Sequence, residues 1–186
     1  MAGEIKVAME TGDSTVGKTA LLQMFTSDGV NFPKNYTMTC GVELCVKSVN
    51  IPETDDSVEL YLYDSGGKDS FTESLKQYWS KPCLLCLVYD VTNENSLQNV
   101  KKWYDMVKTL CEEEHLPAVL IGNKIDLKER RQVSPKAAQE IAKSLEVVYL
   151  ECSVKENKNV PDPFFYLANE WHKMYLEKTT GFKTIT

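Results

Sequence analysis

The segment GDSTVGKT at residues 12–19 constrains the fold of this 186-residue chain more than any other part of its sequence. It follows the apolar run Ile5–Met9 and opens a helical pattern at Lys18–Ser27. The spacing G-x-x-x-x-G-K-[ST] in this context is typical of a loop that curls around phosphate groups. Its glycines let backbone amides face a phosphate, and the helix N-terminus adds a positive dipole end. The start of the chain therefore predicts a strand, an anion-binding loop and a helix.

Short apolar segments alternate with helical patterns along the rest of the chain, which is typical of an α/β fold with a mostly parallel sheet. The linker NIPETDD predicts an antiparallel hairpin that turns at Pro52–Asp56. We expect the last ten residues, EKTTGFKTIT, to be frayed. The expected strands are Ile5–Met9, Val42–Val49, Val58–Tyr63, Leu84–Asp90, Ala118–Gly122 and Val147–Leu150, and the expected helices are Lys18–Ser27, Ser96–Cys111, Pro135–Leu145 and Pro163–Glu177.

Composition and charge narrow the classes of partner. The net charge of -6 argues against a broad nucleic-acid-binding surface, so we expect no nucleic-acid partner. No apolar run is long enough to span a bilayer, and the residue after the first methionine is Ala2 rather than the glycine that myristoylation requires. The final segment GFKTIT has no cysteine to prenylate. These features predict a cytoplasmic protein without a direct lipid anchor.

The six cysteines are expected to be reduced thiols, because nothing in the sequence indicates secretion. Cys83 and Cys86 have the C-x-x-C spacing, but they open a buried apolar run, which favours strand cysteines over zinc ligands. Cys111 and His115 lie four positions apart, and two ligands alone make no structural zinc site.

Lys18 and Thr19 give the phosphate loop its chemistry. The Lys18 ammonium can reach the β- and γ-phosphates of a nucleotide, and the Thr19 hydroxyl can bind Mg²⁺. Asp64 stands at the carboxyl end of the third expected strand, where its carboxylate can hold the same ion through a water. Gly67 completes D-x-x-G, so that its amide can approach a γ-phosphate, although this short motif alone is more often an ordinary turn.

The segment GNKID, which ends the fifth expected strand, indicates which base is bound. Asp126 can accept hydrogen bonds from the N1–H and 2-amino groups of guanine, which adenine cannot offer. The stem of Lys124 can lie along the base, and Asn123 can tie this loop to the phosphate loop. After the sixth strand, residues 153–155 offer a backbone amide to the guanine O6 and a second lysine stem. Together these motifs predict GTP rather than ATP.

Two residues of the loop before the second strand are further candidates. The Thr39 hydroxyl could complete the Mg²⁺ shell only when a γ-phosphate is present, which would order this loop. Phe32 could stack edge-on against guanine. The alternative is that Thr39 only enters the strand and Phe32 only packs on the surface.

These motifs resemble the Ras superfamily of small GTPases over about residues 4–176, and GDSTVGKT, YTMTCGVEL and LVYDVTNENSLQNVKKW are most similar to its Rab branch. The resemblance implies a P-loop NTPase fold, a small G-domain with a six-stranded, mostly parallel sheet, one antiparallel edge strand and five helices. It implies a GTPase domain at residues 1–176 and a short tail at 177–186 without a lipidation site.

The resemblance also implies a site for GTP or GDP with Mg²⁺, in which Thr19, Thr39 and, through a water, Asp64 hold the metal. The implied nucleotide contacts are Gly12, Asp13, Ser14, Thr15, Val16, Gly17, Lys18, Thr19, Ala20, Phe32, Tyr36, Thr39, Asp64, Gly67, Asn123, Lys124, Asp126, Ser153, Val154 and Lys155.

The chain departs from the Rab pattern after the third strand. Rab proteins have W-D-T-A-G-Q-E where this chain has YDSGGKD, so Lys68 occupies the position of the water-orienting glutamine. An ammonium has three donors and no acceptor, so it cannot orient that water, although it can pair with the γ-phosphate. With Gly67 and Lys68 as its catalytic residues, we expect a weak GTPase. Alternatively, Lys68 is a solvated loop residue and hydrolysis needs a residue of a partner.

The segments SDG, YDSGGK, LCLVYDVTNENS and CSVKEN resemble the Rab-like GTPases of intraflagellar transport. This resemblance implies heteromeric rather than homo-oligomeric assembly, with a small β-sandwich subunit and other subunits of the B complex. It also implies a location in the cilium or flagellum and at its base. Phe165, Tyr166 and Phe182 are candidates for a partner-facing patch, or simply single exposed aromatics. The role is either a nucleotide switch, a structural subunit whose nucleotide stabilises the fold, or an atypical vesicle-transport Rab.

Overall fold

The computed structural model describes residues 4–67, 82–111 and 115–183, and side chains from residue 12 to residue 180 within these ranges. Its core is one six-stranded sheet in the order β2-β3-β1-β4-β5-β6. β2 pairs with β3 in antiparallel fashion, and the other neighbours are parallel. The predicted mostly parallel sheet with an antiparallel edge strand is thus confirmed. The strands are β1 (Glu4–Thr11), β2 (Val42–Asn50), β3 (Ser57–Ser65), β4 (Leu84–Asp90), β5 (Ala118–Asn123) and β6 (Val148–Glu151).

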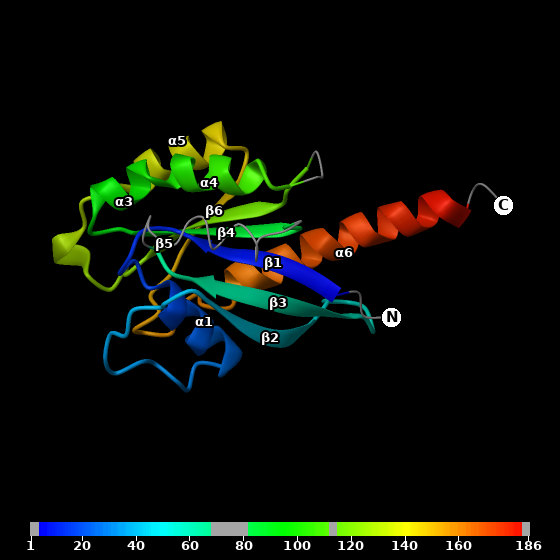
Figure 1. The fold of residues 1–186 in the computed structure, drawn as a ribbon, viewed down its shortest axis with the longest axis horizontal. Coiled ribbons are helices and arrows are strands. Elements are labelled where there is room, and N and C mark those ends of the chain that lie inside the picture. Colours follow the sequence, from blue (N-terminus) through cyan, green and yellow to red (C-terminus); the bar gives the residue numbers. More distant parts are fainter. Residues whose placement is uncertain (1–3, 68–81, 112–114, 184–186) are drawn as a thin grey trace.

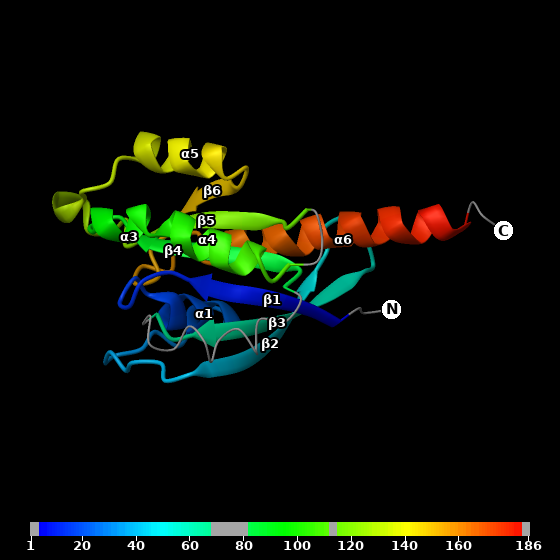
Figure 2. The same cartoon turned by 45° about the horizontal axis from the view of Figure 1, so that its top comes forward.

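Helices cover both faces of the sheet (Figures 1 and 2). One face packs against α1 (Lys18–Thr26) and α6 (Asp162–Lys183), and the Phe25 and Phe164 rings stack there at 3.8 Å. Every residue of β4 and β5 is buried, as expected for interior parallel strands covered on both faces. The other face packs against α3 (Glu94–Gln98), α4 (Val100–Lys108) and α5 (Pro135–Ser144), and a short 3-10 helix, η2 (Lys128–Arg130), precedes α5.

The expected helix Ser96–Cys111 is two consecutive helices, α3 and α4, which begin at Glu94 and end at Lys108, so its predicted start and end were wrong. The reason is local: the Asn93 side chain accepts a hydrogen bond from the Asn95 amide at 3.1 Å and caps a helix that begins at Glu94. Ser96, taken as the start, is instead buried, and its hydroxyl accepts a hydrogen bond from the Asp90 amide.

The last helix is longer than predicted. α6 runs to Lys183, so the expected end at Glu177 and a fully frayed tail were wrong. The Thr179 and Thr180 hydroxyls donate to carbonyls four residues earlier in α6, so their hydrogen bonds are compatible with a continuing helix. The division at 176/177 therefore falls within α6, and the separate tail stays a prediction.

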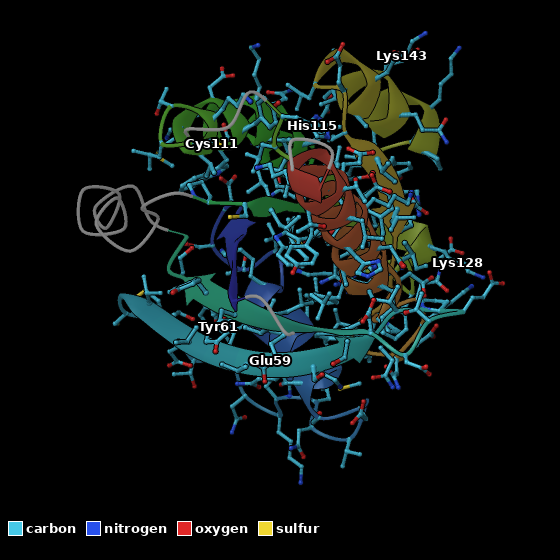
Figure 3. All side chains as sticks on the ribbon, turned by 90° about the vertical axis from the view of Figure 1, so that its right-hand side faces the viewer. Glu59, Tyr61, Cys111, His115, Lys128 and Lys143 are labelled. Atoms are coloured by element: carbon cyan, nitrogen blue, oxygen red, sulfur yellow. The ribbon has the colours of Figure 1, made fainter. Side chains whose placement is uncertain are left out.

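The described residues also bear on the number of helices, on membrane-spanning segments and on the cysteines. The count of five helices stays a prediction, since residues 68–81 lie outside the described ranges. None of the described helices combines the length and apolar character needed to cross a membrane. None of the six cysteines, all of which lie in the described ranges, forms a disulfide. Cys111 and His115, both marked in Figure 3, gain no further ligand, because no three His, Cys, Asp or Glu side chains in the described part are placed to hold a metal.

Candidate nucleotide-binding site

A cavity of about 150 Å³ lies where the phosphate loop, α1, the loop before β2 and the end of β3 meet. Figures 1 and 2 both place this loop and the start of α1 at the end of the molecule opposite the chain termini. Nine of the predicted contacts line the cavity, namely Ser14, Thr15, Gly17, Lys18, Thr19, Ala20, Tyr36, Thr39 and Gly67. The sequence reasoning missed Gln23, Pro33, Asn35, Thr37, Met38 and Ser65, which also line it. Thr37, Met38 and Ser65 occupy variable positions of their motifs, and the other three residues lie outside the motifs.

The phosphate loop needs glycine where the sequence has it. Gly17 has φ +100, the left-handed region that side chains disfavour. A Cβ on Gly12 would lie 2.3 Å from the Val88 carbonyl oxygen, so the loop packs directly on β4. The Lys18 ammonium donates to the carbonyls of Gly12 at 3.0 Å and Asp13 at 3.1 Å. This ammonium is therefore held across the loop, where a phosphate would meet it.

Three oxygen-bearing side chains gather beside Lys18. The hydroxyls of Thr19 and Thr39 are 2.8 Å apart, and Thr39 Oγ1 lies 3.5 Å from Asp64 Oδ2. Adjacent ligands of an octahedral Mg²⁺ lie about 2.9 Å apart, given metal–oxygen distances of about 2.0–2.1 Å. Asp64 Oδ1 is buried and has no hydrogen-bond partner among the described residues. The 2.8 Å separation of the two hydroxyls matches adjacent Mg²⁺ ligands, and the longer distance to Asp64 fits a carboxylate that holds the ion through a water.

The loops before β2 and after β3 are joined at this site. The Gly66 amide donates to the Gly41 carbonyl at 3.1 Å. A Cβ on Gly67 would lie 2.6 Å from both Lys18 Nζ and the Ser14 amide nitrogen, so only glycine fits against the phosphate loop. The predicted catalytic residue Lys68 lies outside the described residues.

Asn123 joins the base-recognition loop to the phosphate loop, as the sequence predicts. Its side-chain amide donates to the Val16 carbonyl at 2.9 Å, and its Oδ1 accepts from the backbone amides of Lys124 and Val154. Asp126 is held in turn by the Ser153 hydroxyl, which donates to Asp126 Oδ1 at 2.8 Å. The three motifs that are far apart in sequence thus form one hydrogen-bonded unit.

Lys124 has a partner that the sequence reasoning missed. Its ammonium donates to the Thr15 carbonyl at 2.8 Å and forms a 2.6 Å ion pair with Asp90. Asp90 is the last residue of β4, and Asp64 is the next-to-last residue of β3. A carboxylate at the end of a buried strand was therefore the feature of the sequence that could have indicated Asp90.

Several predicted contacts do not line the cavity. The Val16 side chain is in the core, so only its backbone is available. The Ser153 amide donates to the Lys158 carbonyl and the Val154 amide to Asn123 Oδ1, and the amide within residues 153–155 that would bind the guanine O6 stays a prediction. Exposed Lys155 and Phe32, 43% exposed, make no described contact with the base-recognition loop, and their nucleotide contacts stay predictions.

A polar network lies at the end of β6, where Glu151 is paired with Gly122 of β5. Arg131 donates two hydrogen bonds to Glu151, at 2.7 and 3.0 Å, and the Tyr149 hydroxyl donates a third. Burial would raise the pKa of Glu151, but these hydrogen bonds and the Arg131 charge lower it. Burial raises the pKa of Tyr89, which contacts Tyr149, to about 12. Burial likewise raises the pKa of Cys152 to about 12, so this thiol stays protonated at neutral pH.

Comparison with known proteins identifies the family. The model of the Ras family matches residues 7–173. The chain is 50% identical over 174 residues to an intraflagellar transport protein 27 homolog of Bos taurus, with 94% of each chain covered. It is 38% identical to intraflagellar transport protein 27 of Chlamydomonas reinhardtii (96% and 89% covered) and 33% identical to the GTP-binding protein ypt2 of Schizosaccharomyces pombe (92% and 83% covered). With this match and the site described above, the chain belongs to the Ras family of small GTPases.

Proposed function

We propose that the chain is a Rab-like GTP-binding subunit of intraflagellar transport that binds GTP or GDP with Mg²⁺ and hydrolyses GTP slowly. The nucleotide function is supported mainly by the cluster of Thr19, Thr39 and Asp64, in which Asp64 Oδ1 has no hydrogen-bond partner among the described residues. The Lys18 ammonium lies in the adjoining phosphate loop. In this site Lys18 would neutralise phosphate charge, the Thr19 and Thr39 hydroxyls would hold the metal directly, and Asp64 would hold it through a water. Mg²⁺ would supply charge neutralisation between the β- and γ-phosphates.

Guanine selectivity in this proposal rests on Asp126. One of its oxygens accepts the Ser153 hydroxyl, which fixes the carboxylate so that it can accept from the guanine N1–H and 2-amino groups. Adenine lacks that pair of donors, so ATP would leave the partly buried carboxylate unsatisfied.

Retention of nucleotide by the purified protein tests this proposal. We expect GDP and GTP, but not ATP, to stay with the protein on a desalting column and to raise its melting temperature. Chelation of Mg²⁺ with EDTA should weaken that retention, because the hydroxyl and carboxylate ligands hold the nucleotide through the metal. Equal retention of ATP, or no retention of GTP, would refute the assignment.

Slow hydrolysis follows from Lys68, which has no acceptor for the attacking water. Small GTPases with glutamine at this position hydrolyse GTP unaided at about 3–5 × 10⁻⁴ s⁻¹. In single-turnover assays we expect the wild type to be slower than this and Lys68→Gln to be faster than the wild type. Lys128→Gln, a change of an exposed lysine elsewhere, serves as the control. A wild-type rate at or above the glutamine-containing rate would contradict this part of the proposal.

The transport role is supported by the near-complete coverage of the similar intraflagellar transport proteins. We propose that the partners are other subunits of the transport B complex, including its β-sandwich subunit, in the cytoplasm and in the cilium or flagellum and its base. Half-exposed Phe165 and partly buried Tyr166 remain candidates for a partner-facing patch, while Phe182 lies outside the described side chains.

Co-purification from ciliated cells, with the protein loaded with GDP or with a non-hydrolysable GTP analogue, separates the alternatives. Recovery of transport subunits with both nucleotides equally would favour a structural subunit at that interface, and a difference would favour a switch. Recovery of vesicle-transport factors without transport subunits would favour the atypical Rab.

A further inference from the structure

Asp13 is a carboxylate in the phosphate loop whose role the nucleotide site leaves unexplained. Its backbone belongs to the loop, yet Asp13 does not line the cavity. Its two oxygens accept hydrogen bonds from α4 and its N-cap residue instead: Oδ2 from the side-chain amide of the N-cap Asn99 at 2.8 Å and Oδ1 from the Trp103 indole N–H at 3.1 Å. A negative charge that would weaken phosphate binding is thereby directed away from the phosphates.

The two donors are built into one turn of helix. Asn99 and Trp103 are four residues apart, and the Trp103 amide donates to the Asn99 carbonyl at 3.2 Å, so their side chains share one face. Trp103 is only 2% exposed, and it belongs with Val107 to the hydrophobic cluster between α4 and the sheet. The indole N–H is therefore fixed in place by core packing, and the carboxylate must come to it.

The backbone of Asp13 contacts two other parts of the phosphate site. Its carbonyl accepts from the Lys18 ammonium at 3.1 Å. A Cβ on Gly67 would lie 2.7 Å from the Asp13 carbonyl carbon and 2.6 Å from the Ser14 amide nitrogen. The peptide between Asp13 and Ser14 is thus held between Lys18, Gly67 and, through the Asp13 side chain, α4.

We propose that Asn99 and Trp103 are positioning residues of the nucleotide site, which act through Asp13 to fix the Asp13–Ser14 peptide. This inference rests on the proposed nucleotide function. Loss of either donor lets the loop relax and leaves a carboxylate oxygen near the phosphates without its partner. The consequence is faster nucleotide release, and α4 becomes an element whose displacement by a partner would change nucleotide affinity.

Dissociation of a fluorescent GDP analogue in excess Mg²⁺ tests the proposal on the full chain. Trp103→Phe keeps an aromatic ring, although a smaller one, and removes the indole N–H, and Asn99→Leu keeps a similar volume and removes the donor. We expect each variant to release the nucleotide about tenfold faster, which corresponds to about 1.4 kcal/mol. Asp13→Asn replaces one carboxylate oxygen with an NH₂ group, which then faces the N–H of Asn99 or Trp103. We expect this variant to release nucleotide at least as fast as the other two.

A double-mutant cycle separates positioning from packing. If Trp103 acts through Asp13, Trp103→Phe adds little to the release rate in the Asp13→Asn background. The control is Val107→Ala, which removes buried volume from the same helix and cluster without touching the phosphate loop. It should lower the melting temperature and leave the release rate within about twofold of wild type, because cavity formation alone does not reach the loop.

Three results would overturn the inference. Additive effects of Trp103→Phe and Asp13→Asn would show that the indole acts by packing, and unchanged release in the single variants would show that the bonds to Asp13 position nothing. A Val107→Ala variant that releases nucleotide as fast as Trp103→Phe would reduce the effect to general destabilisation. If the wild type does not retain GDP, the proposed function is refuted, and this inference is refuted with it. The wild-type measurement therefore distinguishes that failure from a failure of the inference alone.

Discussion

Substitution of Arg131 by methionine should destabilise the chain in a pH-dependent way. Arg131 and Glu151 form a two-point ion pair at 2.7 and 3.0 Å, and their side chains keep 23% and 22% of their surface exposed. Removing one partner of a fully buried pair costs about 3–5 kcal/mol, whereas fully exposed pairs contribute about 0–1 kcal/mol. For this intermediate exposure we expect Arg131→Met to lower the free energy of unfolding by about 1–2 kcal/mol.

The pH dependence follows from the lowered pKa of Glu151. A carboxylate whose folded-state pKa is depressed contributes stability that is fully present above its unfolded pKa of about 4.3 and is lost as the pH falls through the folded pKa. In the variant, burial remains while the Arg131 hydrogen bonds and charge are gone, so the folded pKa of Glu151 rises. The stability gap between wild type and variant should therefore narrow as the pH falls from 7 towards about 4.

Urea unfolding at fixed GDP and Mg²⁺ measures this gap at each pH. Arg130→Met is the matched control, because Arg130 is an exposed arginine in the same turn and experiences the same change in nucleotide binding with pH. We expect the control to stay within about 0.5 kcal/mol of wild type, as surface substitutions do. A gap for Arg131→Met that is the same at pH 7 and pH 4, or that matches the control, would refute the role assigned to the ion pair.

Three further variants test the site and the core. Gly17→Ala should abolish nucleotide retention, since Gly17 has φ +100 and a Cβ there would lie 2.4 Å from Asn123 Nδ2; retention at the wild-type level would show that the loop tolerates a side chain. Ser153→Ala removes the 2.8 Å hydrogen bond to Asp126 and should lower the preference for GDP over IDP, which lacks the 2-amino group, about five- to tenfold in competition binding; an unchanged preference would mean that Asp126 needs no support. Phe164→Ala, at a residue with no exposed surface, should cost about 3–5 kcal/mol in urea unfolding, and a loss below about 1 kcal/mol would contradict the assigned core.

Local signals in the sequence predicted most of the elements correctly. The phosphate loop, the segment around Asp64 at the end of β3 and the N-K-x-D segment each combine a short motif with a strand boundary, and both are properties of neighbouring residues. Because the carboxyl ends of parallel strands lie at one edge of a sheet, these separate motifs could be expected to meet there. The helix ends at 94 and 183 were missed for a different reason: the Asn93 cap and the threonine hydroxyls of α6 compete with other local arrangements of similar energy.

What the sequence by itself determined is which residue types are available at that edge: an ammonium, two hydroxyls, a carboxylate and glycines at fixed positions. Only the tertiary structure decided which partner each polar side chain takes. Asp13 faces α4 rather than the phosphates, Lys124 pairs with Asp90, and Arg131 reaches Glu151 from 20 positions away. The physical reason is range: backbone propensity acts over a few residues, whereas ion pairs and hydrogen bonds form between whichever groups the packed sheet and helices bring within about 3 Å.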